Sequence, residues 1–327
     1  MTVVEPRTPF RHEAMLYADT EEFLARTMPF LQEGLKGGEA MLVLVPTPKI
    51  DILKTRLGSR AGDVHFDDMI EVGRNPGRII SRWHEFLAGR PPDGARVRGI
   101  GEPVWAGRSA AEVVECHRHE ALINEAFADA AGCWVLCPYD TSELPPHSIV
   151  QALRHHPVVT DARGVRVPTA YEPAARTFDE PLGEPEGRPE RFAFDGTCLS
   201  ALRELVAEHA WVAGFHGYRL HDIVLAANEV ATNSVRYAGG RGEIRIWTRG
   251  CELTCEIRDR GYIRDPLAGR IRPEPGRTGG RGLWIANQLC DLVQVRSNAS
   301  GTVVRLTARS TRDQVRATVL VEGGEQT

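Results

Sequence analysis

Lysine is almost absent from this chain of 327 residues, which carries only Lys36, Lys49 and Lys54. Nearly every other cationic side chain is an arginine, and the second half of the chain has no lysine. That half therefore lacks the lysine of a phosphate-binding P-loop and any lysine able to form a Schiff base. A phosphate group bound there would have to be held by backbone N–H groups, arginine or a metal ion.

Several other features are missing, and each absence excludes a class of protein. No apolar run approaches the ~20 residues needed to cross a bilayer, and no N-terminal signal region is visible. The seven cysteines show no disulfide-like spacing. The formal charge of −4 and a pI near 6.3 are unlike a protein that binds nucleic acid directly. We therefore expect a soluble protein of the reducing cytoplasm.

Length and composition indicate two domains, because 42% hydrophobic residues can fill two cores in a chain of this size. We expect a first domain at 10–160, a linker at 161–190, a second domain at 191–310 and a polar tail at 311–327. Five prolines interrupt any period in the linker: Pro168, Pro173, Pro181, Pro185 and Pro189.

The first domain alternates short apolar runs with helical patterns. The runs lie at 14–17, 40–45, 97–100 and 133–137, and the helical patterns at 21–35, 77–87 and 110–130. Strands that are apolar throughout are typical of a parallel sheet covered on both faces. The order predicts an α/β domain with a mainly parallel sheet.

The second domain has a different order. Two helical patterns, 195–213 and 218–237, precede strand patterns at 243–248 and 252–258. A loop rich in Gly, Pro and Arg at 260–278 leads to a helix at 281–290 and to strands at 292–296 and 302–307. The order predicts an α+β domain with helices on one face of a mixed sheet.

Within the second helical pattern, Glu229 and Asn233 lie one turn apart. They should lie opposite the apolar stripe that faces the sheet: Leu220, Ile223, Val224, Ala227, Ala231 and Val235. An amide oxygen can ligate Mg²⁺, and a carboxylate can act as a general base toward a hydroxyl or water. Taken alone, the pair is more simply an ordinary exposed helix face.

Two further motifs follow. Asp259 ends a strand and precedes Gly261; it could accept a hydrogen bond from the adenine amine, although a plain turn explains the motif alone. A Gly-rich run then leads into the next helix, where N–H groups and the helix dipole favour phosphate. Its residues are Gly279, Gly280, Arg281, Gly282 and Leu283.

These three stretches, in this order and spacing, resemble the N, G1 and G2 boxes of GHKL ATPases of the HATPase_c_2 type. The short first helix and compact lid resemble the serine kinases that act as anti-sigma factors. The resemblance implies a Bergerat-type α/β sandwich that binds ATP and Mg²⁺. It implies that Asn233 ligates Mg²⁺, Asp259 reads adenine, the Gly-rich run holds phosphate, and Glu229 is the general base. The implied partners are a sigma factor and a STAS-type anti-anti-sigma protein, with homodimerisation possible in such kinases.

The sequence departs from the family pattern at two places. Ile263 occupies the second glycine position of the G1 box, and Arg236-Tyr237 occupy positions where the family often has His. The first change bears on nucleotide affinity and on catalysis. Three hypotheses stay open: a regulatory Ser/Thr kinase, a nucleotide-gated binding module without catalysis, and a scaffold that binds no nucleotide.

Motifs of the first half are similar to the MEDS sensory family, a reduced RecA/KaiC-like domain. They are the stretches 12–17, 22–24, 29–39, 42–45 and 119–124, and the closing pair 156–157. The resemblance implies a domain that senses a small molecule.

Two other readings of the first half concern individual residues. Cys116, His117, His119 and Glu120 invite a metal site, but a second ligand cluster is not evident in the sequence. The cysteine pairs 133/137 and 251/255 are better explained by core packing. Trp105 follows a strand, where ligands of parallel sheets bind, so it is a candidate for lining a sensory site.

Overall fold

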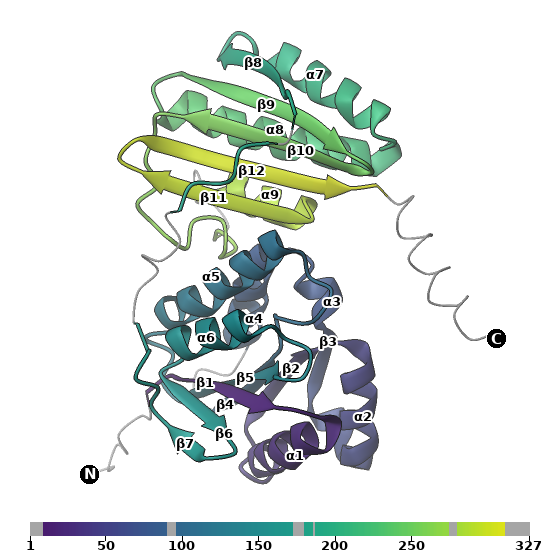
Figure 1. The fold of residues 1–327 in the computed structure, drawn as a ribbon, viewed down its shortest axis with the longest axis vertical. Coiled ribbons are helices and arrows are strands. Elements are labelled where there is room, and N and C mark those ends of the chain that lie inside the picture. The colour runs from purple at the N-terminus through teal and green to yellow at the C-terminus, as the bar shows by residue number, and fades with distance from the viewer. Residues whose placement is uncertain (1–8, 90–95, 173–179, 186, 275–279, 311–327) are drawn as a thin grey trace, which may run out of the picture. The chain divides into compact units, whose positions relative to one another are not determined.

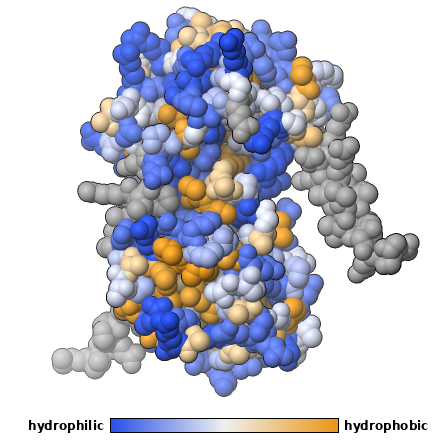
Figure 2. All heavy atoms as spheres, in the orientation of Figure 1, coloured by the Kyte–Doolittle hydropathy of each residue, from blue (hydrophilic) through white to orange (hydrophobic). Residues whose placement is uncertain are grey.

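The computed structural model describes residues 9–89, 96–172, 180–185, 187–274 and 280–310 (Figure 1). The chain divides into two compact units, Met1–Ala175 and Arg176–Thr327. Hydrophilic residues predominate on the visible face of the second unit, as expected when its apolar side chains fill a core (Figure 2).

The first unit contains a seven-stranded sheet in the order β3-β2-β4-β5-β1-β6-β7. All neighbouring strands are parallel except β6 and β7. The strands are β1 (Arg11–Tyr17), β2 (Ala40–Val45), β3 (His65–Asp68), β4 (Val97–Gly101), β5 (Cys133–Asp140), β6 (Val158–Asp161) and β7 (Gly164–Arg166). The helices are α1 (Thr20–Lys36), α2 (Thr47–Leu57), α3 (Met69–Val72), α4 (Ile79–Ala88), α5 (Ala110–Ala126) and α6 (Pro146–His155).

The central strands explain why the parallel sheet was predictable. In β2, every residue from Met41 to Val45 is buried, as expected for a strand covered on both faces. Trp83 of α4 packs against β4, and a Cβ at Gly99 would lie 2.2 Å from its ring. Glycine at that position is what lets the helix approach the sheet.

The structure extends the first sheet beyond the predicted strands. It adds β3, β6 and β7, and helices α2 and α6. Strand β7 lies within the range expected to be a linker, so the sheet of the first unit continues to Arg166. The predicted polar tail, 311–327, lies outside the described residues.

The second unit contains a five-stranded sheet in the order β11-β12-β10-β9-β8. Its strands are β8 (Glu190–Asp195), β9 (Arg241–Arg249), β10 (Glu252–Asp259), β11 (Leu292–Asn298) and β12 (Gly301–Arg309), and its helices are α7 (Leu199–Val212), α8 (Gly217–Tyr237) and α9 (Arg281–Leu289). Every pairing is antiparallel, so the prediction of a mixed sheet was wrong. The short turns of β9–β10 and β11–β12 join neighbours, which must then run in opposite directions.

One face of this sheet packs against the three helices (Figure 1). Leu253, Cys255 and Ile257 of β10 point into that core, so the residues between them point to the other face. The apolar stripe of α8 faces the sheet as predicted, with Ala227 and Ala231 fully buried.

The other face is charged and yet buried. Glu256 is 0% exposed and forms ion pairs of 2.6 Å with Arg305 and 2.7 Å with Arg258. Arg245 also pairs with Glu184, at 2.9 Å. Because a buried carboxylate needs charged partners, the ion pairs between these arginines and Glu256 are part of the fold.

Residues 180–184, here called the strap segment, contact this charged face. Arg305 donates a hydrogen bond to the carbonyl of Gly183 at 2.6 Å, and Arg296 donates one to the carbonyl of Glu180 at 3.1 Å. The end of the predicted linker is therefore attached to the second unit.

Candidate nucleotide-binding site

Helix α8 places Glu229 and Asn233 on the flank that faces α9, where both are half-buried. A Cβ built on Gly282, in the first turn of α9, would lie 2.8 Å from Nδ2 of Asn233 and 3.1 Å from Oε2 of Glu229. The sequence predicted the pair opposite the sheet-facing stripe. The structure places this pair beside α9, which packs against α8.

The start of α9 lies next to this pair. Gly280 precedes the helix in a left-handed conformation, with φ of 80°, and Arg281 is exposed. The N-cap residue Gly280 has no side chain to cap the helix start, and the first N–H groups of a helix have no partner within the helix. They can bind phosphate, with the helix dipole in support. Gly279 lies outside the described residues.

Asp259 ends β10 and is held by two donors. The Ser234 hydroxyl donates a hydrogen bond to Oδ2 at 2.6 Å, and the N–H of Gly261 donates to Oδ1 at 2.8 Å. Each carboxylate oxygen accepts more than one hydrogen bond, so capacity remains for a ligand amine. Ser234 follows Asn233 directly on α8, so its hydrogen bond to Asp259 links the N box to the G1 box.

Sequence reasoning missed Ser234. The available signal was a polar residue at a buried position of α8, since Ser234 is 0% exposed. A buried hydroxyl requires a hydrogen-bond partner. The strand ending in Asp259 was the obvious source of one.

Ile263 stands where the family has glycine, and the structure accommodates it without backbone strain. Its φ is not positive, as for every described non-glycine residue. Its N–H donates a hydrogen bond to Oγ of Ser297 at 2.8 Å. Arg236 and Tyr237, the other departure, are exposed at the end of α8. The two departures therefore leave the contacts of Asp259 intact.

The described part of the predicted lid, 260–274, contacts α9. Asn287 donates a hydrogen bond to the carbonyl of Gly269 at 3.0 Å, and the Arg272 guanidinium lies 5.6 Å from the Trp284 ring. This part of the loop therefore rests on the helix whose start would hold phosphate. The rest of the lid, 275–278, lies outside the described residues.

In the first unit, Trp105 is half-buried under the Arg108 guanidinium, 3.6 Å from its ring centre. The loop after β4 also carries Glu102, which is 1% exposed. Glu102 accepts hydrogen bonds from Lys49 at 2.6 Å and from Tyr17 at 2.7 Å. Burial raises the pKa of Glu102. The sequence pointed to this loop but not to Lys49 or Tyr17, which come from other elements.

The metal reading of the 116–120 stretch is only partly matched. Cys116 is buried and its thiol donates to the carbonyl of Pro103 at 3.1 Å. Among the described residues, Glu120 alone of the four belongs to a group that could hold a metal ion. Cys137, interpreted as a packing residue, is buried and belongs to that same group.

Comparisons with known proteins confirm both family resemblances, one in each half of the chain. A family model described as MEDS, the methanogen/methylotroph DcmR sensory domain, matches residues 11–157. A family model described as a histidine kinase-like ATPase domain matches residues 192–308. A search of curated proteins found no match.

A solved structure of the RsbU and RsbW domains of a Mycobacterium tuberculosis protein aligns with 38% of this chain at 19% identity. Its TM-score is 0.28 and the alignment covers 32% of that chain, about a third of its length, so the likeness is too low to show a shared fold.

The antiparallel sheet, its three helices and the family match define the second unit as a GHKL-type ATPase domain, a class that implies nucleotide binding. The chain carries a MEDS domain followed by this histidine kinase-like ATPase domain. In the described part of the chain, no helix combines the length and apolar character needed to cross a membrane.

Proposed function

We propose that this protein is a signal-responsive anti-sigma regulatory factor whose second unit binds ATP and Mg²⁺. It sequesters a sigma factor, phosphorylates a STAS-type anti-anti-sigma protein on Ser or Thr, or does both. A small-molecule signal acts on the MEDS domain. The family match supports the nucleotide part of the proposal, and the site geometry supports the assignment of residues.

The carrying observation is the convergence of Glu229 and Asn233 on Gly282. It brings an amide oxygen, a carboxylate and a helix start to one place. The donor set suits Mg²⁺, because the ion prefers oxygen ligands and keeps several waters. The missing side chain at Gly282 lets the Asn233 amide and the Glu229 carboxylate lie directly against the backbone of the helix start. The site therefore fits the metal–nucleotide that the family implies.

Each residue has one role in the proposed transfer. Asp259, held by Ser234 and the N–H of Gly261, accepts a hydrogen bond from the adenine amine. The backbone at Gly280, Gly282 and Leu283, with Gly279 and the Arg281 guanidinium, binds the phosphates. Asn233 ligates Mg²⁺, which when bound supplies charge neutralisation on the phosphates.

Glu229 takes the proton of the acceptor hydroxyl. The hydroxyl oxygen forms a bond to the γ-phosphorus as the bond to the β-phosphate oxygen breaks, which leaves ADP. The half-buried position of Glu229 beside Gly282 suits this role, because the acceptor has to approach the phosphate from the same side.

Ile263 motivates a second candidate, a nucleotide-gated binding module without catalysis. In that case ATP sets the shape of the lid and thereby holds or releases the partner. Transfer of labelled phosphate separates the two, because only the kinase passes the γ-phosphate to a protein.

The first test is calorimetry of ATP with Mg²⁺ on the full chain. We expect binding that weakens in Asn233→Ala and disappears without Mg²⁺. Asn228→Ala is the matched control, because Asn228 lies on the same helix and its Oδ1 only accepts a hydrogen bond from Arg203 at 3.0 Å. A folded wild-type protein that binds no ATP would refute the nucleotide site.

The second test uses γ-labelled ATP and the STAS-type proteins of the same genome. We expect transfer by wild type and a large loss in Glu229→Gln with ATP binding retained. Equal transfer by Glu229→Gln would remove the base role. Nucleotide-dependent partner binding with no labelled protein would favour the gated module.

A further inference from the structure

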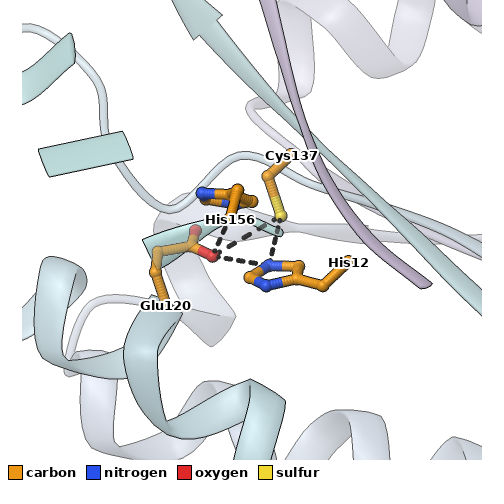
Figure 3. A group of neighbouring side chains, drawn as sticks. All are labelled: His12, Glu120, Cys137 and His156. Carbon is orange, nitrogen blue, oxygen red and sulfur yellow. Dashed lines mark hydrogen bonds and ion pairs between the residues drawn. The ribbon is translucent and has the colours of Figure 1, made fainter. Parts of the chain in front are cut away.

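Four buried side chains meet inside the MEDS domain, from four elements far apart in sequence (Figure 3). They are His12 of β1, Glu120 of α5, Cys137 of β5 and His156, which follows α6. One ligand atom from each lies within 4.8 Å of all the others.

Hydrogen bonds fix the orientation of both imidazoles. Asn124 donates through Nδ2 to the carbonyls of Glu120 at 3.2 Å and His155 at 2.8 Å, so its Oδ1 is the atom that faces His12 Nδ1, at 3.1 Å. Nδ1 of His12 is therefore a donor. Nδ1 of His156 likewise donates to the carbonyl of Ala152 at 2.8 Å.

Each ring consequently points its other nitrogen, Nε2, toward the same carboxylate oxygen. Oε2 of Glu120 lies 2.9 Å from His12 Nε2 and 3.2 Å from His156 Nε2. A backbone or side-chain acceptor behind the outer ring nitrogen is the arrangement that metal-ligating histidines normally have.

Among these four side chains the acceptors outnumber the donors, and the neighbouring Tyr139 hydroxyl, also buried without a partner among the described residues, adds a single donor. Oε1 of Glu120 and Nε2 of His156 are buried without a hydrogen-bond partner among the described residues. A proton on Nε2 of one histidine can satisfy only that ring's contact with Glu120. A cation at the centre would serve both imidazoles, the carboxylate and the sulfur together. Unpartnered buried polar atoms are costly, so this excess calls for a ligand.

Four of the six separations between ligand atoms are close to those of tetrahedral coordination, and the other two, from His156 to His12 and to Cys137, lie within 4.8 Å. With Zn–N near 2.0 Å and Zn–S near 2.3 Å, the edges of a tetrahedron are about 3.3–3.6 Å. Sγ of Cys137 lies 3.3 Å from His12 Nε2 and 3.6 Å from Glu120 Oε2. These values and the two Glu120–histidine separations need adjustments of only a few tenths of an ångström to accept an ion.

We propose that His12, Glu120, Cys137 and His156 bind one divalent transition-metal ion, with zinc the best match. Two imidazoles, a thiolate and a carboxylate form a donor set that zinc takes in tetrahedral geometry. The thiol proton is released on binding, and the two anionic ligands then balance the charge of the ion. Because all four ligands are buried protein groups, the site is closed and structural.

The ion joins segments from the beginning, the middle and the end of the MEDS domain. His12 and His156 lie near the two ends of the family match, and Glu120 and Cys137 come from the helix and strand between them. Metal binding therefore links the first strand to the last helix of the domain, and its removal should loosen that domain selectively.

The test begins with the full chain purified without chelator. We expect about one zinc per chain by elemental analysis, and a lower melting temperature after chelation that added zinc restores. Co²⁺ added to the stripped protein should give the absorption of a tetrahedral site together with a thiolate-to-cobalt charge-transfer band. Folded protein that holds no zinc, gives no cobalt band and melts unchanged on zinc addition would overturn the proposal.

Two cysteine variants locate the site. Cys137→Ser should abolish the charge-transfer band, and Cys133→Ala should keep it, since Cys133 is buried in the same strand but outside the group. Loss of the band in Cys133→Ala alone would refute the assignment. If Cys137→Ser does not fold, the wild-type titration still decides, because a band without sulfur character excludes Cys137. Far-UV circular dichroism of each variant reports separately on whether the chain is folded.

Discussion

Replacement of Gly282 by alanine should separate nucleotide binding from folding. The added Cβ would lie 2.8 Å from Nδ2 of Asn233. An ordinary contact needs about 3.5 Å, so the Asn233 amide must move by about 0.7 Å. Mg²⁺ requires its ligands near 2.0–2.1 Å in octahedral geometry, and a displacement of this size breaks the bond to the amide oxygen.

We expect the affinity for ATP with Mg²⁺ to fall about 10–100-fold, equivalent to about 1.4–2.8 kcal/mol. Stability should not fall with it. Gly282 lies within α9 at a φ that alanine can adopt, and alanine in a helix gains about 0.5–1 kcal/mol over glycine. The clash is with the ends of side chains, which can turn aside in the free protein.

The assay is calorimetric titration beside a thermal melt of each variant. Gly196→Ala is the control, since its Cβ would lie 3.4 Å from Val235 Cγ1, an ordinary contact. Wild-type affinity in Gly282→Ala would refute the site geometry. A fall in affinity matched by a large loss of stability would mean that the substitution disturbs the fold instead.

Two further predictions follow from single contacts. Ser234→Ala removes the hydroxyl that donates to Asp259. The affinity for ATP should fall about 10-fold or more, and the free energy of unfolding should fall by an amount on the order of 1.5–3 kcal/mol. An unchanged affinity by calorimetry would mean that Ser234 does not help Asp259 to bind adenine. In the first unit, burial lowers the pKa of His117 to about 4, below an unfolded value of 6.5. The unfolded chain therefore binds the extra proton first, so stability on the order of 2–3 kcal/mol present above pH 6.5 is lost as the pH falls toward 4. In thermal melts across this pH range, the melting temperature of His117→Gln should depend less on pH than that of wild type. An equal pH dependence would mean that His117 is not the group responsible.

The parts of the fold that the sequence predicted have strong local patterns. The all-apolar run of β2 and the helical stripe of α8 each indicate their own structure, because burial decides them residue by residue. The GHKL boxes could also be recognised from the sequence, since each box is a short contiguous stretch. That these boxes belong to one site was implied by the family resemblance and not by any one pattern; the structure shows Glu229 and Asn233 beside Gly282.

The missed elements lack such patterns. Strand β3 reads His-Phe-Asp-Asp and has no residue that is fully buried, so only its pairing with β2 makes it a strand. Strand β7 is three residues long and lies in a proline-rich stretch. In both cases neighbouring strands override local preference, which a linear reading does not contain.

The buried metal group was out of reach for another reason. A helical period pairs Cys116 with His119 or Glu120, so spacing alone pointed to the wrong partners. The true partners of Glu120 lie at positions 12, 137 and 156, which only the parallel sheet brings together. The usable signal was weaker: His12, Glu120 and His156 lie in stretches that resemble the MEDS family, and Cys137 ends an apolar strand pattern.

The strap segment changes the point at which the second unit begins as a module that could be joined to another protein. The family match begins at residue 192, yet residues 180–184 shield the arginines around Glu256. A fusion that joined a foreign sensor directly at residue 191 would strip that cover and leave a charged sheet face open to water or to unintended partners. Recombination that swaps sensory inputs should therefore succeed when the junction lies ahead of Glu180, and the inheritable module is longer than the stretch by which the family is recognised.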